Sequence, residues 1–391
     1  MGSFLRSFAV AFVLVAAAIA GFNVVMDPFA FFGTPRIEGF NAKQYPKAHH
    51  FLYNVKPLQL ALRQPATVIL GTSRVQQGFD PNQLKSCVEG ETYNLGLSAL
   101  TIGEIGDLFR YAAEQAPVRK AFVELDFLGF VGVQGRKYKL PRRLNDVRWK
   151  PTATFDILFS FSAVKYSLLA LAVNLTDLGR PHYLKGSGLR QWGTVPGELD
   201  SKLPASTYGS KLRPHRNPEA INRGMAVVES IIRTARAKGI DLKFFIPPSH
   251  VGRLRSILDR GEWEVFKDWK RRAVILASDN GIPVWDFADY SPIAQEGATA
   301  GVSRYFVDLA HFKPEVGTSM IDRMCPDSAQ AAMADGFGTK VDAQNIERHL
   351  AEIDRQGRAY WSGNRKVTAF YEDLKERALR FTRSRMPDPD V

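Results

Sequence analysis

The chain has 391 residues, of which 45% are hydrophobic and 24% are charged. This composition excludes a disordered, collagen-like or polytopic membrane protein, and the length suggests two domains or one large domain with insertions. The 52 basic and 40 acidic side chains give a formal net charge of +12. That charge favours anionic partners such as acidic polysaccharide, phospholipid head groups or nucleic acid, without choosing among them.

An apolar segment lies at the amino terminus. Between Phe8 and Met26 there is no charged residue, and Asn23 is the one strongly polar residue. A stretch of this length is just able to cross a bilayer. Because Arg6 and the amino terminus precede it and Asp27 follows it, the positive-inside rule places the rest of the chain outside the cytoplasm. We therefore predict a signal anchor over residues 1–26, with the main domain outside the cytoplasm.

Two other interpretations of this segment stay open. The sequence Ala18-Ile19-Ala20 could be a signal-peptidase site, although the apolar run continues past it, which favours an uncleaved anchor. A buried core helix is the third interpretation. The two cysteines, Cys87 and Cys325, exclude a disulfide scaffold and have no metal-ligand spacing. They could pair outside the cytoplasm, or they could be two unrelated buried thiols.

Short apolar runs alternate with amphipathic stretches after residue 66. We predict strands at 67–70, 92–96, 120–127, 242–246 and 283–287, and helices at 101–115, 225–238 and 263–280. This alternation is typical of an α/β domain with a mainly parallel sheet flanked by helices.

The remaining segments are assigned by composition. We predict an irregular linker or cover over residues 27–65, an α/β domain over 66–326 with an insertion at 132–222, and a polar helical tail over 327–391. The insertion begins with a basic section, residues 132–150, which either faces lipid head groups or an acidic glycan or is a solvated basic surface. Within the insertion, residues 155–175 predict a packed or membrane-facing helix, and we favour a lid over the core.

The candidate catalytic residues lie in two places, directly after the first predicted strand and near the end of the α/β region. They are Ser73, in Gly71-Thr72-Ser73-Arg74, and the pair Asp308 and His311, in Asp308-Leu309-Ala310-His311. A serine hydroxyl needs an imidazole as general base, and the imidazole needs a carboxylate that fixes its tautomer. Open α/β sheets place their ligands at the carboxyl ends of strands, where both motifs lie. Alternatively, Ser73 is a helix N-cap, Asp308 a loop cap and His311 a core imidazole.

These two motifs resemble the SGNH, or GDSL-like, hydrolase superfamily, which has a Gly-Asp-Ser type turn early and Asp-x-x-His late. The match covers roughly residues 67–321, with Thr72 in place of the aspartate. The resemblance implies a three-layer, flavodoxin-like fold and a catalytic triad of Ser73, His311 and Asp308. It also implies oxyanion donors from the amides of Ser73 and Gly96. A third donor, an asparagine after the third strand, is missing, because that strand leads to Asp126 and Phe127.

Three further polar residues are candidates for the substrate cleft. Arg74 either orients an anionic substrate or forms a surface ion pair. His250, after Pro247-Pro248-Ser249, either lines the cleft or is a hydrogen-bonded loop histidine. Asn94 either contacts substrate or forms a turn. No dinucleotide-binding, Walker or metal-binding motif occurs, so we predict no cofactor and no metal.

The leading functional hypothesis is an anchored, extracytoplasmic acyltransferase or esterase that acts through an acyl-Ser73 intermediate. Anchored proteins resembling this layout include those for O-acetylation of bacterial exopolysaccharides such as alginate and for D-alanylation of cell-wall polymers. The resemblance thus implies a single-pass protein of the bacterial inner membrane with its main domain in the periplasm, a surface polysaccharide substrate, and a membrane acyl-donor protein as partner. The location outside the cytoplasm argues against nucleic acid as a partner. The first alternative is a non-catalytic glycan-binding or assembly subunit that keeps the fold. The second is a lipid-directed esterase, prompted by the anchor and by residues 155–175.

Overall fold

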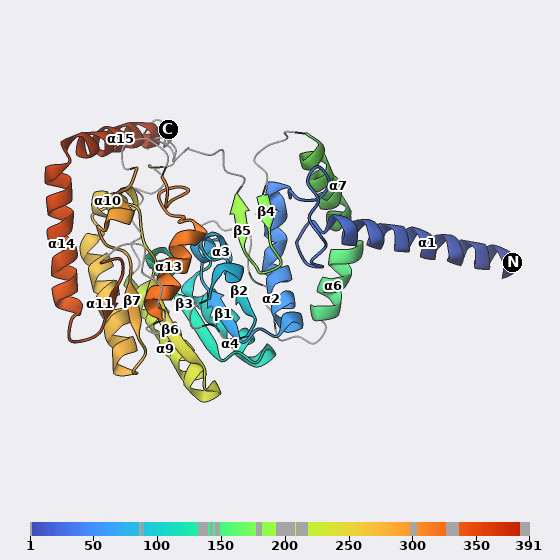
Figure 1. Cartoon of the computed structure of the whole chain (residues 1–391), viewed down its shortest axis with the longest axis horizontal. Coiled ribbons are helices and arrows are strands. Elements are labelled where there is room, and N and C mark those ends of the chain that lie inside the picture. Colours follow the sequence, from blue (N-terminus) through green and yellow to red (C-terminus); the bar gives the residue numbers. More distant parts are fainter. Residues whose placement is uncertain are drawn as a thin grey trace, which may run out of the picture.

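A computed structural model describes residues 2–85, 88, 90–131, 140, 144, 149–176, 182–192, 208, 218–297, 303–325 and 336–383 of the chain. One long helix, α1 (Gly2–Met26), projects from the body of the molecule, as Figure 1 shows. This helix is long and apolar enough to cross a membrane, and its apolar stretch is almost entirely exposed.

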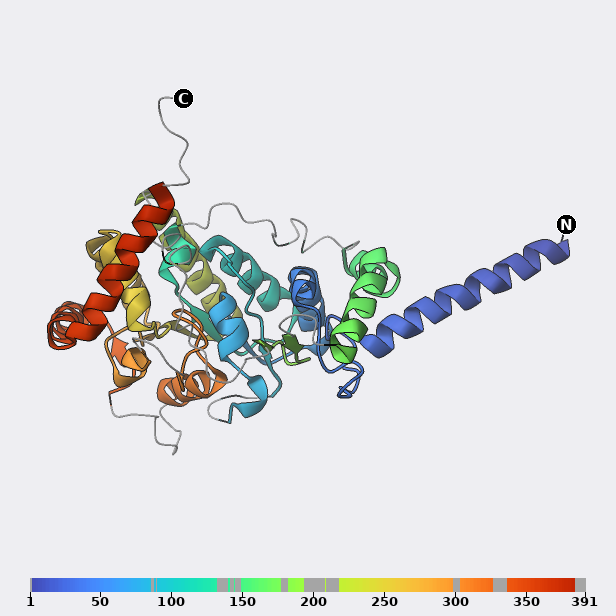
Figure 2. The same cartoon turned by 90° about the horizontal axis from the view of Figure 1, so that it is seen from above.

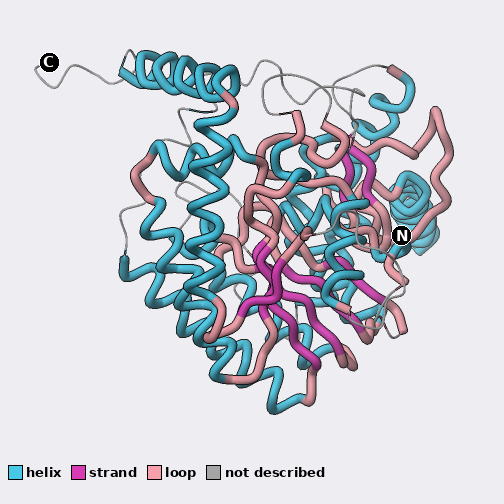
Figure 3. The backbone as a smooth tube through the Cα atoms, turned by 60° about the vertical axis from the view of Figure 1, so that its left-hand side comes forward, coloured by secondary structure: helices cyan, strands magenta, loops and turns pink. Residues whose placement is uncertain are grey.

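The body is built on a six-stranded sheet, drawn in magenta in Figure 3, with the order β2-β1-β3-β6-β7-β8. Its strands are β1 (Thr67–Leu70), β2 (Thr92–Asn94), β3 (Lys120–Glu124), β6 (Asp241–Ile246), β7 (Val284–Asp286) and β8 (Thr339–Val341). The first five pair in parallel, and β8 pairs antiparallel with β7. The predicted α/β class with a mainly parallel sheet is confirmed.

Helices cover both faces of this sheet. One face carries α4 (Ile102–Gln115), α9 (Pro218–Lys238) and α11 (Trp263–Asp279), and the other carries α3 (Ser73–Gly78) and α13 (Pro314–Met324). Successive strand residues alternate between the two layers, since Val68 packs in the first apolar cluster and Ile69 in the second. Burial on both faces explains the apolar runs at 68–70 in β1, 121–123 in β3 and 244–246 in β6.

The expected linker at 27–65 is wrong over its second half. It contains a short 3-10 helix, η1 (Pro46–Phe51), and the helix α2 (Leu52–Arg63), whose Val55 and Leu60 are fully buried in the core. Pro57 lies inside α2 and weakens its helical pattern in the sequence. Two further short helices, α5 (Phe127–Val131) and α10 (Val251–Asp259), follow β3 and β6 and were not predicted.

The expected polar tail is also more closely joined to the domain than its composition indicates. It contributes β8 to the sheet, and the next helix, α14 (Ile346–Gly363), buries Ile346, Leu350 and Ile353 in the main core. The last helix is α15 (Arg365–Arg383), and with α14 it lies at the side of the molecule opposite α1 in Figure 1. Within the described residues, this segment therefore contains a strand of the main sheet followed by two helices.

The insertion contains a bent pair of helices and a hairpin. Helices α6 (Trp149–Phe159) and α7 (Phe161–Leu175) meet at Ser160 with a bend of 47° and pack against α1. The pair lies beside the amino-terminal helix and also buries Ala153, Ile157 and Ala163 in the main apolar core, so it is a packed helix pair on the α1 side of the domain. Strands β4 (His182–Leu184) and β5 (Arg190–Trp192) form an antiparallel hairpin next to β2. Most of the basic section 132–150 lies outside the described residues.

Candidate active site

Ser73 is the first residue of α3, directly after the turn that follows β1. Thr72 is the N-cap of this helix, and its hydroxyl accepts a hydrogen bond from the amide of Arg74 at 3.3 Å. The capping role considered for Ser73 is thus taken by Thr72, which leaves the Ser73 hydroxyl available for another partner. The turn requires glycine at position 71, because a Cβ atom there would lie 2.2 Å from a carboxylate oxygen of Glu124.

The structure brings Ser73, His311 and Asp308 together. The hydroxyl oxygen of Ser73 lies 2.7 Å from Nε2 of His311, and Nδ1 of His311 lies 2.7 Å from Oδ2 of Asp308. The other carboxylate oxygen of Asp308 accepts hydrogen bonds from the amides of Ala310 and His311, at 2.7 and 2.9 Å. Asp308 therefore caps its own loop and orients the imidazole at the same time.

Solvent reaches this group of side chains. The side chain of His311 is 21% exposed and that of Asp308 is 48% exposed. Within the described residues no hydrogen-bond acceptor is found for the amide of Ser73. A reacting carbonyl approaching the Ser73 hydroxyl would find this amide free to stabilise a developing oxyanion.

The loop that carries His311 is fixed by contacts of the residues before and after the histidine. Phe306 and Phe312 form an isolated antiparallel bridge, and the amide of Val307 donates to the carbonyl of His311 at 2.8 Å. Beyond this loop, α13 packs so closely on α3 that a Cβ atom at Gly317 would lie 1.8 Å from the carbonyl oxygen of Gly78. This close approach sets the distance between the helix that begins with Ser73 and the segment that contains His311.

Arg74 is buried and binds protein groups. Its guanidinium donates to the carbonyl of Pro248 and, at 3.2 Å, to the carboxylate of Asp126, while Nε donates to the carbonyl of Ala310 at 3.0 Å. The surface ion pair considered for Arg74 is wrong, because only 3% of the residue is exposed. Burial lowers the pKa of Arg74 to about 10, and the neighbouring Arg253 adds to this effect. Arg74 joins the loops around the site and is a positioning residue.

Glu124, the last residue of β3, was not singled out in the sequence. It is fully buried, and its carboxyl group accepts hydrogen bonds from the amide and, at 3.2 Å, from the hydroxyl of Thr72. Burial, with the nearby Asp126, raises the pKa of Glu124 to about 7, while Arg74 opposes the shift. The available signal was an acid at the end of an otherwise apolar strand.

The expected roles of Gly96 and Asn94 are corrected. Asn94 is fully buried; its amide group donates to the carbonyls of Val75 and Phe79, both at 2.8 Å. Its side-chain oxygen accepts the amide of Gly96 at 2.9 Å, so this amide is already engaged and is not a free oxyanion donor. Gly96 is needed for packing, because a Cβ atom there would lie 2.5 Å from the amide nitrogen of Gln76. Asn94 has the turn-forming role.

His250 does not line the site. It is fully buried as the N-cap of α10; its Nδ1 accepts the amide of Gly252 at 3.1 Å, and its Nε2 lies 3.0 Å from the carbonyl of Glu296. The loop-histidine alternative is therefore correct. At the third oxyanion position, Asp126 pairs with Arg74 and, at 2.8 Å, with Arg253. Among the residues that the structure describes, no three His, Cys, Asp or Glu side chains are close enough to hold a metal ion.

The chain has a serine, an imidazole and a carboxylate hydrogen-bonded in series at the carboxyl ends of a parallel sheet. No protein-family model and no curated protein matches it. A hydroxyl, an imidazole and a carboxylate arranged in this way are the parts that nucleophilic acyl transfer requires.

Proposed function

We propose that this protein is a membrane-anchored, extracytoplasmic serine acyltransferase or esterase of SGNH type that acts on acyl groups of a surface polysaccharide. The observation that carries the proposal is the pair of 2.7 Å contacts from Ser73 to His311 and from His311 to Asp308. The strand order β2-β1-β3-β6-β7, with Ser73 after β1, agrees with the flavodoxin-like order 2-1-3-4-5.

In the proposed reaction, His311 takes the proton of Ser73 as its hydroxyl oxygen attacks the acyl carbonyl. Asp308 stabilises the imidazolium, and the amide of Ser73 donates to the oxyanion of the tetrahedral intermediate. Collapse breaks the bond to the leaving group, which receives the proton from His311, and leaves acyl-Ser73. A sugar hydroxyl or water, deprotonated by His311, then attacks the acyl-enzyme and restores free Ser73.

The proposed location is supported by two features. The helix α1 is long and apolar enough to be an anchor. In addition, Cys325 is disulfide-bonded, and the other cysteine of the chain is Cys87, which lies outside the described residues. Disulfides persist in oxidising compartments such as the bacterial periplasm. A polysaccharide acceptor and a membrane acyl-donor partner are proposed on the resemblance to anchored acylation proteins.

The test is covalent labelling of the full-length protein with a fluorophosphonate probe. We expect the wild type to be labelled, Ser73→Ala to be unlabelled and His311→Ala to be labelled far more slowly. Ser362→Ala is the matched control, because Ser362 is an exposed serine on α14 and should leave labelling unchanged. A folded wild type that stays unlabelled would contradict the proposal.

The second candidate is a non-catalytic glycan-binding or assembly subunit. It is favoured by the engagement of the Gly96 amide with Asn94 and by the absence of an asparagine at the third oxyanion position. The absence of labelling, together with retained binding of an acidic polysaccharide, would support this candidate. A lipid-directed esterase would instead turn over esters with acyl chains longer than acetyl.

A further inference from the structure

Helices α6 and α7 are apolar on two sides. Their inner sides are buried, as at Ile157, Ala163 and Val173. Their outer sides expose large apolar side chains: Phe155 (61% exposed), Phe159 (36%), Phe161 (84%), Leu168 (54%) and Leu175 (68%). Asp156 and Lys165 are the exposed charged residues of the pair. A concentration of exposed apolar side chains of this kind marks an interaction surface, and a long lysine side chain at a membrane surface can extend its charged end to the head groups.

This apolar surface is continuous with the candidate membrane helix. The α1 residue Asn23 is fully buried between the pair; its amide nitrogen donates to the carbonyl of Leu158 at 2.7 Å, and its oxygen accepts the hydroxyl of Ser167 at 2.7 Å. In Figure 1 α6 and α7 lie at the base of α1 and run across its direction, and Figure 2 places them there as well. A bilayer crossed by α1 would therefore have α6 and α7 along its surface.

The apolar surface extends onto α2. A groove of about 500 Å³ between α2 and α6 is lined by Leu58, Ala61 and Leu62 on one side and by Phe155 and Phe159 on the other. Leu62 is 66% exposed, although it lies on a helix whose other side is in the core. The apolar surface of α6 and α7 beside α1 thus continues onto α2, which comes from an earlier part of the chain and packs against α6.

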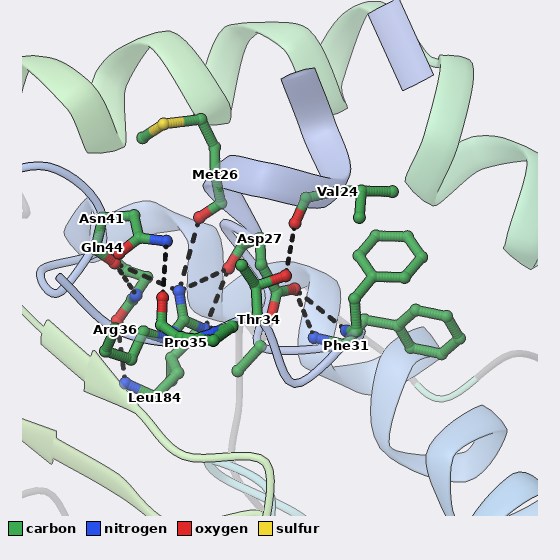
Figure 4. Close-up of polar contacts among 12 residues, drawn as sticks. Val24, Met26, Asp27, Phe31, Thr34, Pro35, Arg36, Asn41, Gln44 and Leu184 are labelled. Carbon is green, nitrogen blue, oxygen red and sulfur yellow. Dashed lines mark hydrogen bonds and ion pairs between the residues drawn. The ribbon is translucent and has the colours of Figure 1, made fainter. Parts of the chain in front are cut away.

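No flexible linker separates α1 from the domain. Figure 4 shows that the last carbonyls of the helix are bonded by the segment that follows: Val24 accepts from Thr34 at 2.6 Å, and Val25 accepts from Asn41 at 2.9 Å. Arg36 donates to the carbonyl of Asp27 at 3.1 Å and pairs with its carboxylate at 3.3 Å. The carbonyls at the end of a helix lack partners within it, so these bonds fasten α1 to the segment that follows. Gln44 joins this segment to the domain, because its side-chain oxygen accepts the amide of Leu184 at 2.9 Å.

We propose that lipid of the outer leaflet covers the exposed face of α6, α7 and the adjoining surface of α2, so that the catalytic domain is held against the bilayer in one orientation. This inference rests on α1 being a membrane anchor, as proposed above. Lipid is the occupant because the patch continues the lipid-facing surface of α1 and lies across its direction. Amphipathic or apolar helices of this kind lie in the interface plane, with aromatic side chains at the boundary.

The test places single nitroxide labels on the full-length protein in phosphatidylcholine nanodiscs. Cysteine is introduced at Phe161, Leu168 or Leu175, and Cys325 is already disulfide-bonded. Leu14→Cys on α1 is the lipid control, and Leu379→Cys on α15, 41% exposed, is the water control. We expect labels on α7 to collide severalfold more with oxygen, relative to a water-soluble nickel chelate, than the label at position 379.

The controls separate failure of this inference from failure of the anchor. If the label at position 14 is in lipid while labels on α7 behave like that at 379, the inference is overturned and the anchor stands. If the label at position 14 also behaves like that at 379, the proposed anchor fails and the inference fails with it. Labels on α7 that are immobilised and shielded from both oxygen and nickel would indicate a second copy of the chain, which also overturns the inference.

Discussion

The carboxyl group of Glu124 accepts hydrogen bonds from both the amide and the hydroxyl of Thr72. Thr72 in turn caps the helix that begins with Ser73. The last residue of β3 therefore fixes the turn that follows the neighbouring strand β1. The orientation of the Ser73 hydroxyl depends on this contact, although Glu124 itself does not face a substrate.

We expect Glu124→Gln to keep labelling by the fluorophosphonate probe within a few-fold of wild type. A glutamine oxygen can still accept from the Thr72 amide, and its NH₂ group can donate to the Thr72 hydroxyl. Glu124→Leu leaves the buried amide without a partner, at a cost of about 1–3 kcal/mol, and should reduce the labelling rate strongly. Equal labelling rates for folded Glu124→Leu and wild type would remove the positioning role.

The pH dependence of stability follows from the same residue. The pKa of Glu124 is raised from 4.5 to about 7, so the folded state keeps a proton that the unfolded state has lost. Ionisation then favours unfolding, and the wild type loses stability as pH rises from about 4.5 to about 7. Glu124→Gln cannot ionise, so its melting temperature relative to wild type should increase across this range. A difference in melting temperature that is constant between pH 4.5 and 7 would be inconsistent with the raised pKa.

Asp308→Asn should lower the labelling rate, on the order of 10⁴-fold, without unfolding the protein. Asparagine still presents an oxygen to the amides of Ala310 and His311 but no longer accepts from Nδ1 of His311 as a carboxylate does, so the imidazole loses its fixed tautomer. The measurement is the rate of probe labelling, with the melting temperature as a check on folding. A labelling rate close to that of the wild type would mean that Asp308 only caps its loop.

Gly317→Ala should reduce both stability and labelling. Its Cβ atom would lie 1.8 Å from the carbonyl oxygen of Gly78, which is backbone and cannot rotate away. Helix α13 must then move from α3, and His311 moves with it. The control is Gly363→Ala, which meets nothing within 4 Å and should be neutral or slightly stabilising. Thermal melts and probe labelling of both variants provide the comparison, and parallel behaviour of the two would contradict the packing argument.

Asp286→Asn should destabilise the carboxy-terminal side of the domain. The carboxylate of Asp286 lies 2.6 Å from the ammonium group of Lys270 and 2.9 Å from His349, and it is fully buried with Lys270. Removing the charge leaves the buried ammonium group of Lys270 with the carbonyl of Ala288 at 2.8 Å but without a counter-ion, which costs about 3–5 kcal/mol.

The contribution of Asp286 to the free energy of unfolding should also depend on pH. Although burial opposes the shift, Lys270 and His349 lower the pKa of Asp286 from 3.8 to about 2, so its contribution to stability is present above about pH 4 and is lost as pH falls through 2. The free energies of unfolding of wild type and Asp286→Asn, measured by denaturant titration, should therefore differ at pH 6 and become equal toward pH 2. If the difference in unfolding free energy does not decrease toward pH 2, the carboxylate charge is not responsible for that difference.

The sequence predicted the elements that have a strong local pattern. Strands β1, β3 and β6 contain short apolar runs, and Ser73 stands in a motif directly after the first of them, while Asp308 and His311 stand in a four-residue motif late in the domain. The sequence could not decide the roles of Asn94 and His250. A polar residue at a strand end has the same local sequence pattern whether it faces a cleft or caps a neighbouring loop. Contacts across the chain, such as that of the Gly96 amide with Asn94, decide between the two.

Other features have no local signal strong enough to predict. Strand β8 is three residues long and lies in a polar segment, so only its pairing with β7 assigns it to the sheet. The role of Glu124 depends on a contact with Thr72, which is 52 residues away in the chain. The location of α6 and α7 likewise depends on their packing against α1, and their apolar sequence fits a lid equally well.

Strand β8 has a practical consequence for shortening this chain. Because it covers the outer edge of β7, a truncation before residue 339 would leave a row of unpaired amides and carbonyls along a buried strand. Such a fragment is expected to self-associate in expression trials even though it retains Ser73, Asp308 and His311. A shorter version intended for crystallography should therefore keep the chain through α15 and be trimmed only after residue 383.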